Sequence, residues 1–506
     1  MEKHRCLDSI ARRKKQFALR VVQKKHSEIL AWLSSFDKWS RPERTRALEH
    51  LLTRCDRTQT RRIANLIAPK LQIDFVSRLP HTLSRCILSY LDAATLAQAR
   101  LVSKTWCQLA EDEHLWREKC EEDGVQNNSD SFRLSYAARK NLEVNWRSGR
   151  FYKISGLRGH EDHVITCLQV CGDRVVSGSD DNTLKVWCMK SGQPLVTLTG
   201  HSGGVWCCEM DYNRVISGST DRTLRVWSLP FGTCEHTLTG HVSTVRCIAL
   251  RGNRVVSGSR DATLRVWDVE KGTCLHVLHG HQAAVRCVVF DGWTVVSGSY
   301  DHSVRVWKPF TLNLTVHVLR GHTNRVYALQ CDGARAVSGS LDTCIIVWDI
   351  KHLCALHRLT GHRSLTSGMV LHGDLLISGN ADATLRVWNL LTGKCLHILA
   401  GPNRHRSAVT GLQLVGSELV VSASDDGSVK LWSMKTGRFI RDLVSLQSSG
   451  VGGVVWRIQC NSDRLICAVG SRNGIEETKL LVLDFDITSF PQQTTFDNVV
   501  SPQFDI

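Results

Sequence analysis

Histidine, serine, aspartate and tryptophan recur together from residue 160 onward in this 506-residue chain, and three of these residue types can form a catalytic triad. One such set is His241, Ser257, Asp261 and Trp267. An enzyme needs its nucleophile once, whereas this set returns in repeat after repeat. A buried hydrogen-bond network that orders each repeat is therefore the favoured interpretation. The sequence predicts a non-catalytic protein that has no cofactor and no metal site.

Arginines form the second group of chemically informative residues, because they replace neutral residues at equivalent points of the repeats. Like charges held together repel one another, and an anion would relieve that repulsion. A guanidinium group binds phosphate with two hydrogen bonds, so a phosphorylated Ser/Thr segment fits such a cluster. Two positions in each repeat carry this variation, and both are expected on one face around a central channel. The candidate phosphopeptide-binding residues are Arg246, Arg260, Arg286, Arg222, Ser243, Thr244, Tyr300, Arg457 and Arg472.

The first variable position lies five residues after a recurring histidine. Counted in this way it holds Ile165, Trp206, Arg246, Arg286, Tyr327, Ser367 and Thr410, with Arg457 as the best match in an eighth unit. The competing interpretation of the arginines is that they pair with Asp180 or Asp425 on the same rim. Inositol phosphate and nucleic acid are the less favoured anions.

A repeat supplies the elements that position these residues. Six Gly-His pairs are spaced 40 or 41 residues apart, and a Trp follows each of them about 26 residues later. A period of 40–45 residues with these signals is the WD-repeat signature. Each unit predicts four short strands, and closing such units into a ring leaves few strand edges open.

Seven units are clear and the eighth is degenerate. Residues 465–471 and 479–486 match its second and third strands, although no Trp is present. Residues 152–157 would then supply the outer strand that closes the ring. The prediction is an all-β eight-bladed WD-repeat propeller over residues 151–487, with seven blades as the alternative, followed by a C-terminal tail at 488–506.

The positive charge is concentrated near the N-terminus. Residues 1–71 hold 18 Lys+Arg against 7 Asp+Glu, in a chain with a net charge of +16. Either a nuclear-import or nucleic-acid-binding segment centred on residues 12–15 or a solvated helix face explains this charge. The aromatic residues are not interleaved with the basic ones as a base-stacking surface would need, so nucleic-acid binding is not favoured.

Cysteine usage and hydropathy indicate the compartment. The chain has 20 cysteines but no apolar signal core and no apolar run that could span a membrane. We therefore expect reduced thiols, no membrane association, and a location in the nucleus and cytoplasm.

Residues 72–120 are expected to form short helices that leave an apolar surface for a partner. The first begins at Leu79-Pro80, the second covers about residues 94–102, and the third carries Trp106 and Trp116. These segments, with residues 87–91, 102–106, 109–110 and 115–116, resemble the F-box, which binds the Skp-type adaptor. The predicted architecture is thus the propeller preceded by an all-α F-box and a helical N-terminal region.

An F-box followed by WD repeats resembles the substrate receptors of SCF ubiquitin ligases. Residues 164–168, 259–264 and 468–486 are similar to the archipelago type, which captures phosphodegrons. The resemblance implies a non-catalytic subunit that joins phosphorylated protein substrates, through the Skp-type adaptor, to a cullin–RING assembly for ubiquitination and proteasomal degradation. It implies that phosphate is held by Arg246, Arg260 and Arg286, with the other candidates in supporting places. The adaptor-facing residues that it implies are Leu79, Pro80, Ile87, Leu91 and Leu96.

The remaining segments carry weaker expectations. Residues 1–71 form a basic helical region in which the apolar spacing over 26–71 is similar to the dimerisation segment upstream of such F-boxes. A homodimer is favoured over an intramolecular helical cap. Residues 121–150 are expected to be a linker in which residues 142–146 reach the propeller. A scaffold without ligase function is the remaining alternative for the whole chain.

Overall fold

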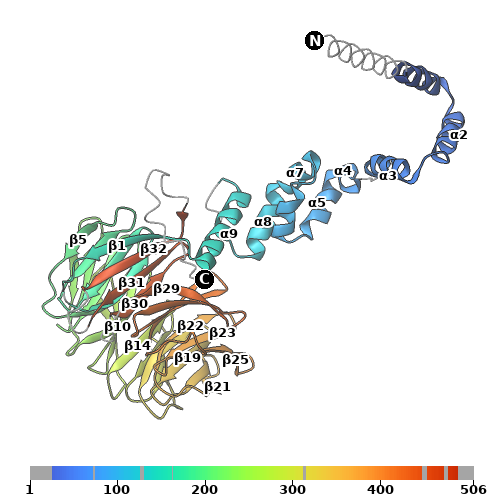
Figure 1. The fold of residues 1–506 in the computed structure, drawn as a ribbon. Helices are drawn as coiled ribbons and strands as arrows, with labels where there is room; N and C mark the ends of the chain where they lie inside the picture. Colours follow the sequence, from blue (N-terminus) through green and yellow to red (C-terminus); the bar gives the residue numbers. More distant parts are fainter. Residues whose placement is uncertain are drawn as a thin grey trace, which may run out of the picture. The chain divides into compact units, whose positions relative to one another are not determined.

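The computed structural model describes residues 25–71, 74–125, 130–161, 163–311, 315–446, 453–471 and 477–487. The chain divides into two compact units, Met1–Tyr136 and Ala137–Ile506. The described part of the first unit is helical, and the second unit consists mainly of strands (Figure 1). The predicted order of a helical region followed by an all-β propeller is therefore confirmed.

The helices are short. The first described helix covers residues 25–38. It is followed by α2 (Arg41–Leu52), α3 (Arg57–Leu71), α4 (Phe75–Arg78), α5 (His81–Ser89), α6 (Ala93–Ala99), α7 (Lys104–Ala110), α8 (Glu113–Glu122) and α9 (Phe132–Ser148). None of the helices in the described ranges is long and apolar enough to cross a membrane.

Polar N-caps set where α6, α7 and α8 begin. The side chains of Asp92, Ser103 and Asp112 accept hydrogen bonds from amides in the first turns of α6, α7 and α8, at 3.1, 3.3 and 2.8 Å. The expectation of one helix carrying both Trp106 and Trp116 is wrong. Asp112 ends that run because it caps α8, so the two tryptophans lie on separate helices.

One apolar core joins these small helices. Trp116 is 3% exposed and its indole Nε1 donates to the carbonyl of Ala110 at 2.7 Å. Other fully buried members of this core are Leu88, Leu96, Leu115 and Cys120. Apolar residues on the inward faces of these helices are buried in this core. Other apolar residues lie on the outward faces and are exposed to solvent.

The second unit is a ring of eight four-stranded antiparallel sheets. Blade one contains β2 (Ile165–Cys171), β3 (Arg174–Ser179), β4 (Leu184–Cys188) and β5 (Pro194–Leu198). Blade two contains β6 (Val205–Met210), β7 (Arg214–Ser219), β8 (Leu224–Ser228) and β9 (Cys234–Leu238). Blade three contains β10 (Val245–Arg251), β11 (Arg254–Ser259), β12 (Leu264–Asp268) and β13 (Thr273–Leu278). Blade four contains β14 (Val285–Phe290), β15 (Val295–Ser299), β16 (Val304–Lys308) and β17 (Thr315–Leu319).

The other four blades continue the ring. Blade five contains β18 (Val326–Cys331), β19 (Arg335–Ser340), β20 (Ile345–Asp349) and β21 (Cys354–Leu359). Blade six contains β22 (Thr366–His372), β23 (Leu375–Asn380), β24 (Leu385–Asn389) and β25 (Lys394–Leu399). Blade seven contains β26 (Val409–Val415), β27 (Leu419–Ser424), β28 (Ser428–Ser433) and β29 (Phe439–Ser445). Blade eight contains β30 (Val454–Cys460), β31 (Arg464–Gly470), β32 (Lys479–Asp484) and β1 (Tyr152–Arg158).

Strand β1 closes the ring, as the sequence predicts. It pairs antiparallel with β32, from Tyr152 opposite Asp484 to Arg158 opposite Lys479. The inner strand of blade eight contacts the inner strand of blade one, and the inner strands of all eight blades contact their neighbours in turn. The eight-bladed prediction is confirmed and the seven-bladed alternative is wrong. These eight inner strands line the central channel.

The recurring His, Ser, Asp and Trp residues form buried networks. In blade three, Asp261 accepts from Nδ1 of His241 at 2.8 Å, and the other ring nitrogen of His241 shares a 2.8 Å hydrogen bond with the Ser257 hydroxyl. The indole of Trp267 donates to the same hydroxyl at 2.8 Å. The His–Ser and Trp–Ser contacts recur in blades one to seven at 2.7–2.9 Å. Because Ser257 is fully buried, it cannot reach a substrate, and the set is structural.

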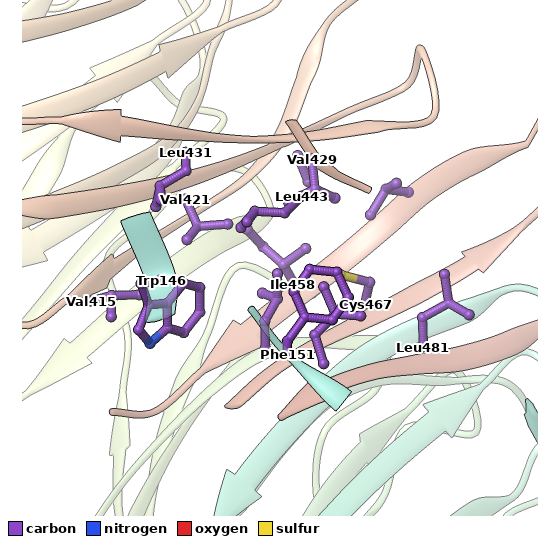
Figure 2. Close-up of a cluster of buried hydrophobic side chains, with 14 of the residues drawn as sticks. Trp146, Phe151, Val415, Val421, Val429, Leu431, Leu443, Ile458, Cys467 and Leu481 are labelled. Atoms are coloured by element: carbon purple, nitrogen blue, oxygen red, sulfur yellow. The ribbon is translucent and has the colours of Figure 1, made fainter. Parts of the chain in front are cut away.

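The end of α9 packs against blades seven and eight. Trp146 is 1% exposed, and its ring stacks on Phe485 with centroids 3.7 Å apart. Its indole nitrogen donates to the carbonyl of Ser462 at 3.0 Å. Figure 2 shows Trp146 and Phe151 among apolar side chains of these blades, including Val415, Leu443 and Leu481. The expectation that residues 142–146 reach the propeller is confirmed.

Candidate functional site

Each inner strand carries a β-bulge at one residue. In blade three the pairing steps from Val245 to Cys247, which leaves Arg246 as the bulged residue. Such a bulge turns its side chain away from the regular alternation of the sheet. The bulged residues of blades one to eight are Thr166, Trp206, Arg246, Arg286, Tyr327, Ser367, Thr410 and Trp456.

The strand register corrects two of the positions counted from the sequence. Ile165 is 1% exposed in the apolar core, and Thr166 holds the bulge of blade one. Blade one has one residue more between His160 and its inner strand, so counting from the histidine falls one residue short. In blade eight no histidine is available for counting. There Trp456 is the bulged residue and Arg457 lies one place further, at the position that corresponds to Cys247.

The second variable position is the residue directly before the turn aspartate of each repeat. It is structurally equivalent in all seven clear repeats. The amide of Arg260 donates to the carbonyl of Thr244 at 2.9 Å, and the amide of Tyr300 donates to the carbonyl of Ala284 at 3.0 Å. The same bond is made by Asp180, Thr220, Leu341, Ala381 and Asp425. This bond places each variable residue beside the start of its own inner strand, and so beside the bulge. Arg472 lies outside the described residues.

The structure brings Arg246, Arg260 and Arg286 within electrostatic reach of one another. Burial lowers the pKa of Arg246, and the positive charges of Arg286 and Arg260 lower it further. Burial also lowers the pKa of Arg457, with smaller effects in the same direction from Arg286 and Arg246. Arg457 keeps solvent contact on the channel wall although many protein atoms surround it. These four residues form what we call the arginine face.

No carboxylate of the described residues lies within salt-bridge distance of the arginine face. Arg246, Arg260, Arg286 and Arg457 form no ion pair within 4.0 Å there. The carboxylate of Asp180 instead lies against the backbone of Gly204, where an added Cβ would clash with its Oδ1 atom. No ion pair between Asp180 and these four arginines is therefore observed, and the alternative pairing of arginines with Asp425 stays untested.

Aromatic rings border the arginine face. The Arg246 guanidinium lies over the Trp206 ring, 4.2 Å from its centroid. The rings of Tyr300 and Tyr327 are 5.2 Å apart, and the Arg325 guanidinium lies 5.1 Å from the centroid of Tyr300. Burial raises the pKa of Tyr300, and a hydrogen bond with Tyr327 raises it further, so its hydroxyl remains protonated at neutral pH.

The rim residues of blades two and three lie beside this face. Ser243 and Thr244 are half-buried, and Thr244 accepts the amide of Arg260 through its carbonyl. Arg222 is exposed and adopts a left-handed backbone with φ of 72°, directly after the turn aspartate of blade two. These placements are compatible with the supporting roles that the family resemblance implies, and those roles stay predictions.

Sequence reasoning missed Arg325, Thr166 and Trp456. Arg325 occupies the position of Thr244, because its carbonyl likewise accepts the amide of the variable residue in its blade, here Leu341 at 2.9 Å. Aligning the residue before each inner strand would have found it. Thr166 and Trp456 were missed because their repeats depart from the common spacing.

Four of the five residues predicted to face the adaptor are at least partly accessible on the small helices. Leu79 and Ile87 are 37% and 45% exposed, Pro80 is exposed and Leu91 is half-buried. The prediction for Leu96 is wrong, because its side chain is fully buried in the helical core and cannot contact a partner. Further exposed apolar residues on these helices and their turns are Leu83, Tyr90, Leu101 and Val102.

Family models match both units. The F-box-like model matches residues 76–122. The model of the WD domain, G-beta repeat, matches residues 151–188, 192–228, 232–268, 272–308, 313–349, 354–389 and 393–433, which together make up more than half of the chain. Strands β30, β31 and β32 of blade eight lie outside these matches.

Several known proteins are similar to this chain. F-box/WD repeat-containing protein 7 of Drosophila melanogaster is 66% identical over 477 residues, which cover 91% of this chain and 36% of that protein. F-box/WD repeat-containing protein sel-10 of Caenorhabditis elegans is 44% identical over 220 residues, covering 34% of this chain and 38% of that protein. The crystal structure of the computationally designed Ika8 protein matches with a TM-score of 0.58 and 33% identity, covering 66% of this chain and 99% of that one. The matched regions span little more than a third of the length of the two curated relatives.

Proposed function

The chain belongs to the family of F-box/WD-repeat proteins, and from this premise we propose that it is the substrate-recognition subunit of an SCF-type ubiquitin ligase. In this proposal the arginine face binds phosphorylated degrons, and the F-box binds a Skp-type adaptor that leads to a cullin–RING assembly. The subunit itself performs no chemistry. It accelerates ubiquitination and hence proteasomal degradation by holding the substrate close to the charged enzyme.

The observation that carries the proposal is the group of arginines without carboxylate partners in the described part of the chain. Arg246 and Arg286 come from the bulges of neighbouring blades, and Arg260 comes from the rim beside them. A phosphorylated residue carries about −1.5 to −2 charge at neutral pH and offers three acceptor oxygens. Each hydrogen bond to a charged group contributes about 1.5–3 kcal/mol, so three arginines provide enough energy to anchor a short phosphopeptide.

The exposed apolar residues of the small helices support the second half of the proposal. Leu83 and Ile87 lie four residues apart on α5 and are 52% and 45% exposed, so they share one face of that helix. Leu79 and Pro80 precede α5 and are also exposed. An apolar helix face of this kind is the surface that an adaptor helix would cover.

Calorimetry with the full chain tests the phosphopeptide half. A doubly phosphorylated peptide that contains a Thr-Pro pair is titrated beside its unphosphorylated twin at two salt concentrations. We expect only the phosphorylated form to bind, and more weakly at high salt because screening weakens the charge interaction. Arg286→Ala should weaken binding at least tenfold. Arg214→Ala is the matched control, since Arg214 lies at the far end of β7 from the rim. Unchanged affinity of Arg286→Ala would refute the proposal.

We also propose that the N-terminal helices form a homodimer interface. The described helices of residues 25–71 expose Ile29, Trp32, Leu33, Leu48 and Leu66, with exposed fractions between 39% and 66%. Helix α2 buries none of its residues in the first unit. Light scattering should give twice the mass of the chain, and Leu33→Glu should restore the monomer. A monomeric wild-type chain at micromolar concentration would contradict this proposal.

A further inference from the structure

One layer away from the arginine face, a ring of eight equivalent described residues on the inner strands contains one carboxylate. Glu209 lies on β6, three residues beyond the bulged Trp206, and pairs with Ile216 of β7. The equivalent positions of the other seven blades hold uncharged residues, which are Gln169, Ala249, Val289, Gln330, Val370, Gln413 and Gln459. Glu209 is therefore the one ionisable member of this ring of eight described residues.

Hydrogen bonds between neighbouring blades show where the side chains of this ring lie. The side-chain amide nitrogen of Gln413 donates to the side-chain amide oxygen of Gln459 at 2.5 Å. The side-chain amide nitrogen of Gln459 donates to the side-chain amide oxygen of Gln169 at 3.0 Å. The chain of amides passes from blade seven through blade eight to blade one. The next position around the channel is Glu209 on blade two.

Glu209 shares a cavity with members of the arginine face. The cavity has a volume of about 230 Å³ and is lined by four neighbouring inner strands. Glu209, Arg246, Arg457, Trp206 and Gln169 all contribute to its wall. A strand rises about 3.3 Å per residue, so three residues separate the carboxylate layer from the bulge layer by roughly 10 Å. Glu209 therefore faces the same cavity as Arg246 and Arg457, while Arg251 is the cation whose charge acts on the Glu209 pKa.

Glu209 is also the group in this cavity whose charge changes near neutral pH. Burial raises its pKa to about 7, and the charge of Arg251 opposes that rise. The other titratable or charged groups around it are Cys207 and Cys208 on β6, Cys167 on β2, Arg246, Cys247 and Arg251 on β10, and Arg457 on β30. Burial raises the pKa of Cys207 and Cys247, so these thiols stay neutral, while the arginines stay charged.

We propose that Glu209 tunes the arginine face, so that its carboxylate weakens phosphopeptide binding and its protonation strengthens binding as the medium becomes more acidic. The carboxylate compensates part of the charge on Arg246 and Arg457 and repels the bound phosphate. Glu209 touches no phosphate itself and acts through these arginines. The inference rests on the proposed function of the arginine face.

The test compares the wild-type chain with Glu209→Gln, which places in blade two the residue type that four other blades carry. The affinity for the doubly phosphorylated peptide is measured by calorimetry on the full chain at pH 6, 7 and 8. Unit charges 10 Å apart interact enough to change an affinity by about twofold in water and more in a partly buried site. We therefore expect Glu209→Gln to bind about threefold more tightly than wild type at pH 8 and equally tightly at pH 6.

The ratio of the two affinities isolates Glu209. The second pKa of the phosphate also lies near 6, but its protonation affects both proteins and cancels in the ratio. Gln169→Glu adds a carboxylate to the same cavity and should weaken binding about threefold at pH 8. Glu235→Gln removes an equal charge from the exposed strand β9 and should leave the ratio at one throughout.

The outcomes separate this inference from the proposed function. A ratio that does not change between pH 6 and pH 8 overturns the role of Glu209 while the arginine face stands. Failure of both proteins to bind the phosphopeptide overturns the arginine face, and the inference falls with it.

Discussion

Arg464 links the two blades at which the propeller ring closes. Its Nε donates to Asp484 of blade eight at 2.7 Å, and its NH1 group donates to Asp173 of blade one at 2.8 Å. Asp484 has no solvent exposure, and burial raises its pKa even though Arg464 opposes the rise. By strand register Arg464 and Asp484 correspond to Arg254 and Asp268 of blade three, so this ion network joins the strands at a different level from the His–Ser–Trp network of the other blades.

Replacing Arg464 by Met should open the ring locally. The change keeps the length of the side chain but leaves the buried carboxylate of Asp484 without its cation, which costs about 3–5 kcal/mol. Asp484 is the β32 residue that pairs with Tyr152, so the penalty falls on the β1–β32 pair. Replacing both partners, as Arg464→Met with Asp484→Leu, removes the uncompensated charge. The double variant should therefore recover most of the loss.

Native-state hydrogen exchange of the full chain measures this local stability. A loss of about 3–5 kcal/mol corresponds to a fall in amide protection of about 10²- to 4 × 10³-fold at 1.4 kcal/mol per decade. We expect this fall in peptides from β1 and β32, with blades three to five unchanged and the double variant close to wild type. Unchanged protection of β1 in Arg464→Met would refute the reasoning. A double variant no more protected than Arg464→Met would refute the charge argument.

Three further predictions follow from the described contacts. Ser257→Ala should lower the free energy of unfolding by about 2–4 kcal/mol, because it leaves two buried donors or acceptors unsatisfied. Urea titration measures this loss, and an unchanged midpoint would contradict the structural role of Ser257. Burial lowers the pKa of His362 to about 4. Between about pH 6.5 and 4 the unfolded chain therefore binds a proton that the folded chain does not. The free energy of unfolding falls as the pH falls in that window. Urea midpoints of wild type and His362→Gln should therefore converge toward pH 4, and parallel pH profiles would exclude this linkage. Ile87→Glu should abolish co-purification of a Skp-type adaptor without changing the melting temperature, whereas Leu96→Glu should unfold the small helices. If Ile87→Glu still retains the adaptor, the interface lies elsewhere.

The fold was predictable because the repeat is local. Each clear unit contains its own His, Ser and Trp at fixed spacing, and these residues meet within one blade, as His241, Ser257 and Trp267 do. The eighth blade could be identified only by its strand pattern. Its ring-closing strand β1 was still predictable. The segment before the first repeat contains one strand without a partner in its own repeat, and the sheet of blade eight lacks its outer strand. The single helix expected through Trp106 was wrong, because the N-cap at Asp112 competes with the apolar periodicity.

The arginine face was predictable in its residue types but only partly in its positions. Equivalent positions could be counted where a histidine anchors the repeat, and Arg246 and Arg286 lie as expected. The counting was off by one residue in blades one and eight, where an additional residue or a missing histidine changes the register. Leu96 was assigned to a surface although its helix turns it into the core, and periodicity alone does not say which neighbour covers an apolar face.

The sequence by itself determined the number of blades, the order of the units and the kinds of residue that vary among equivalent positions. These properties depend on spacing and on contacts within one repeat, which a linear pattern contains. Only the tertiary structure decided which residues share the channel. Bulge register and ring closure set the neighbours of Arg457, which lies far along the chain from Glu209 and Arg246. They bring these three residues to the wall of one cavity. Electrostatic coupling depends on distance in space and on burial, so it is settled only when the ring is closed.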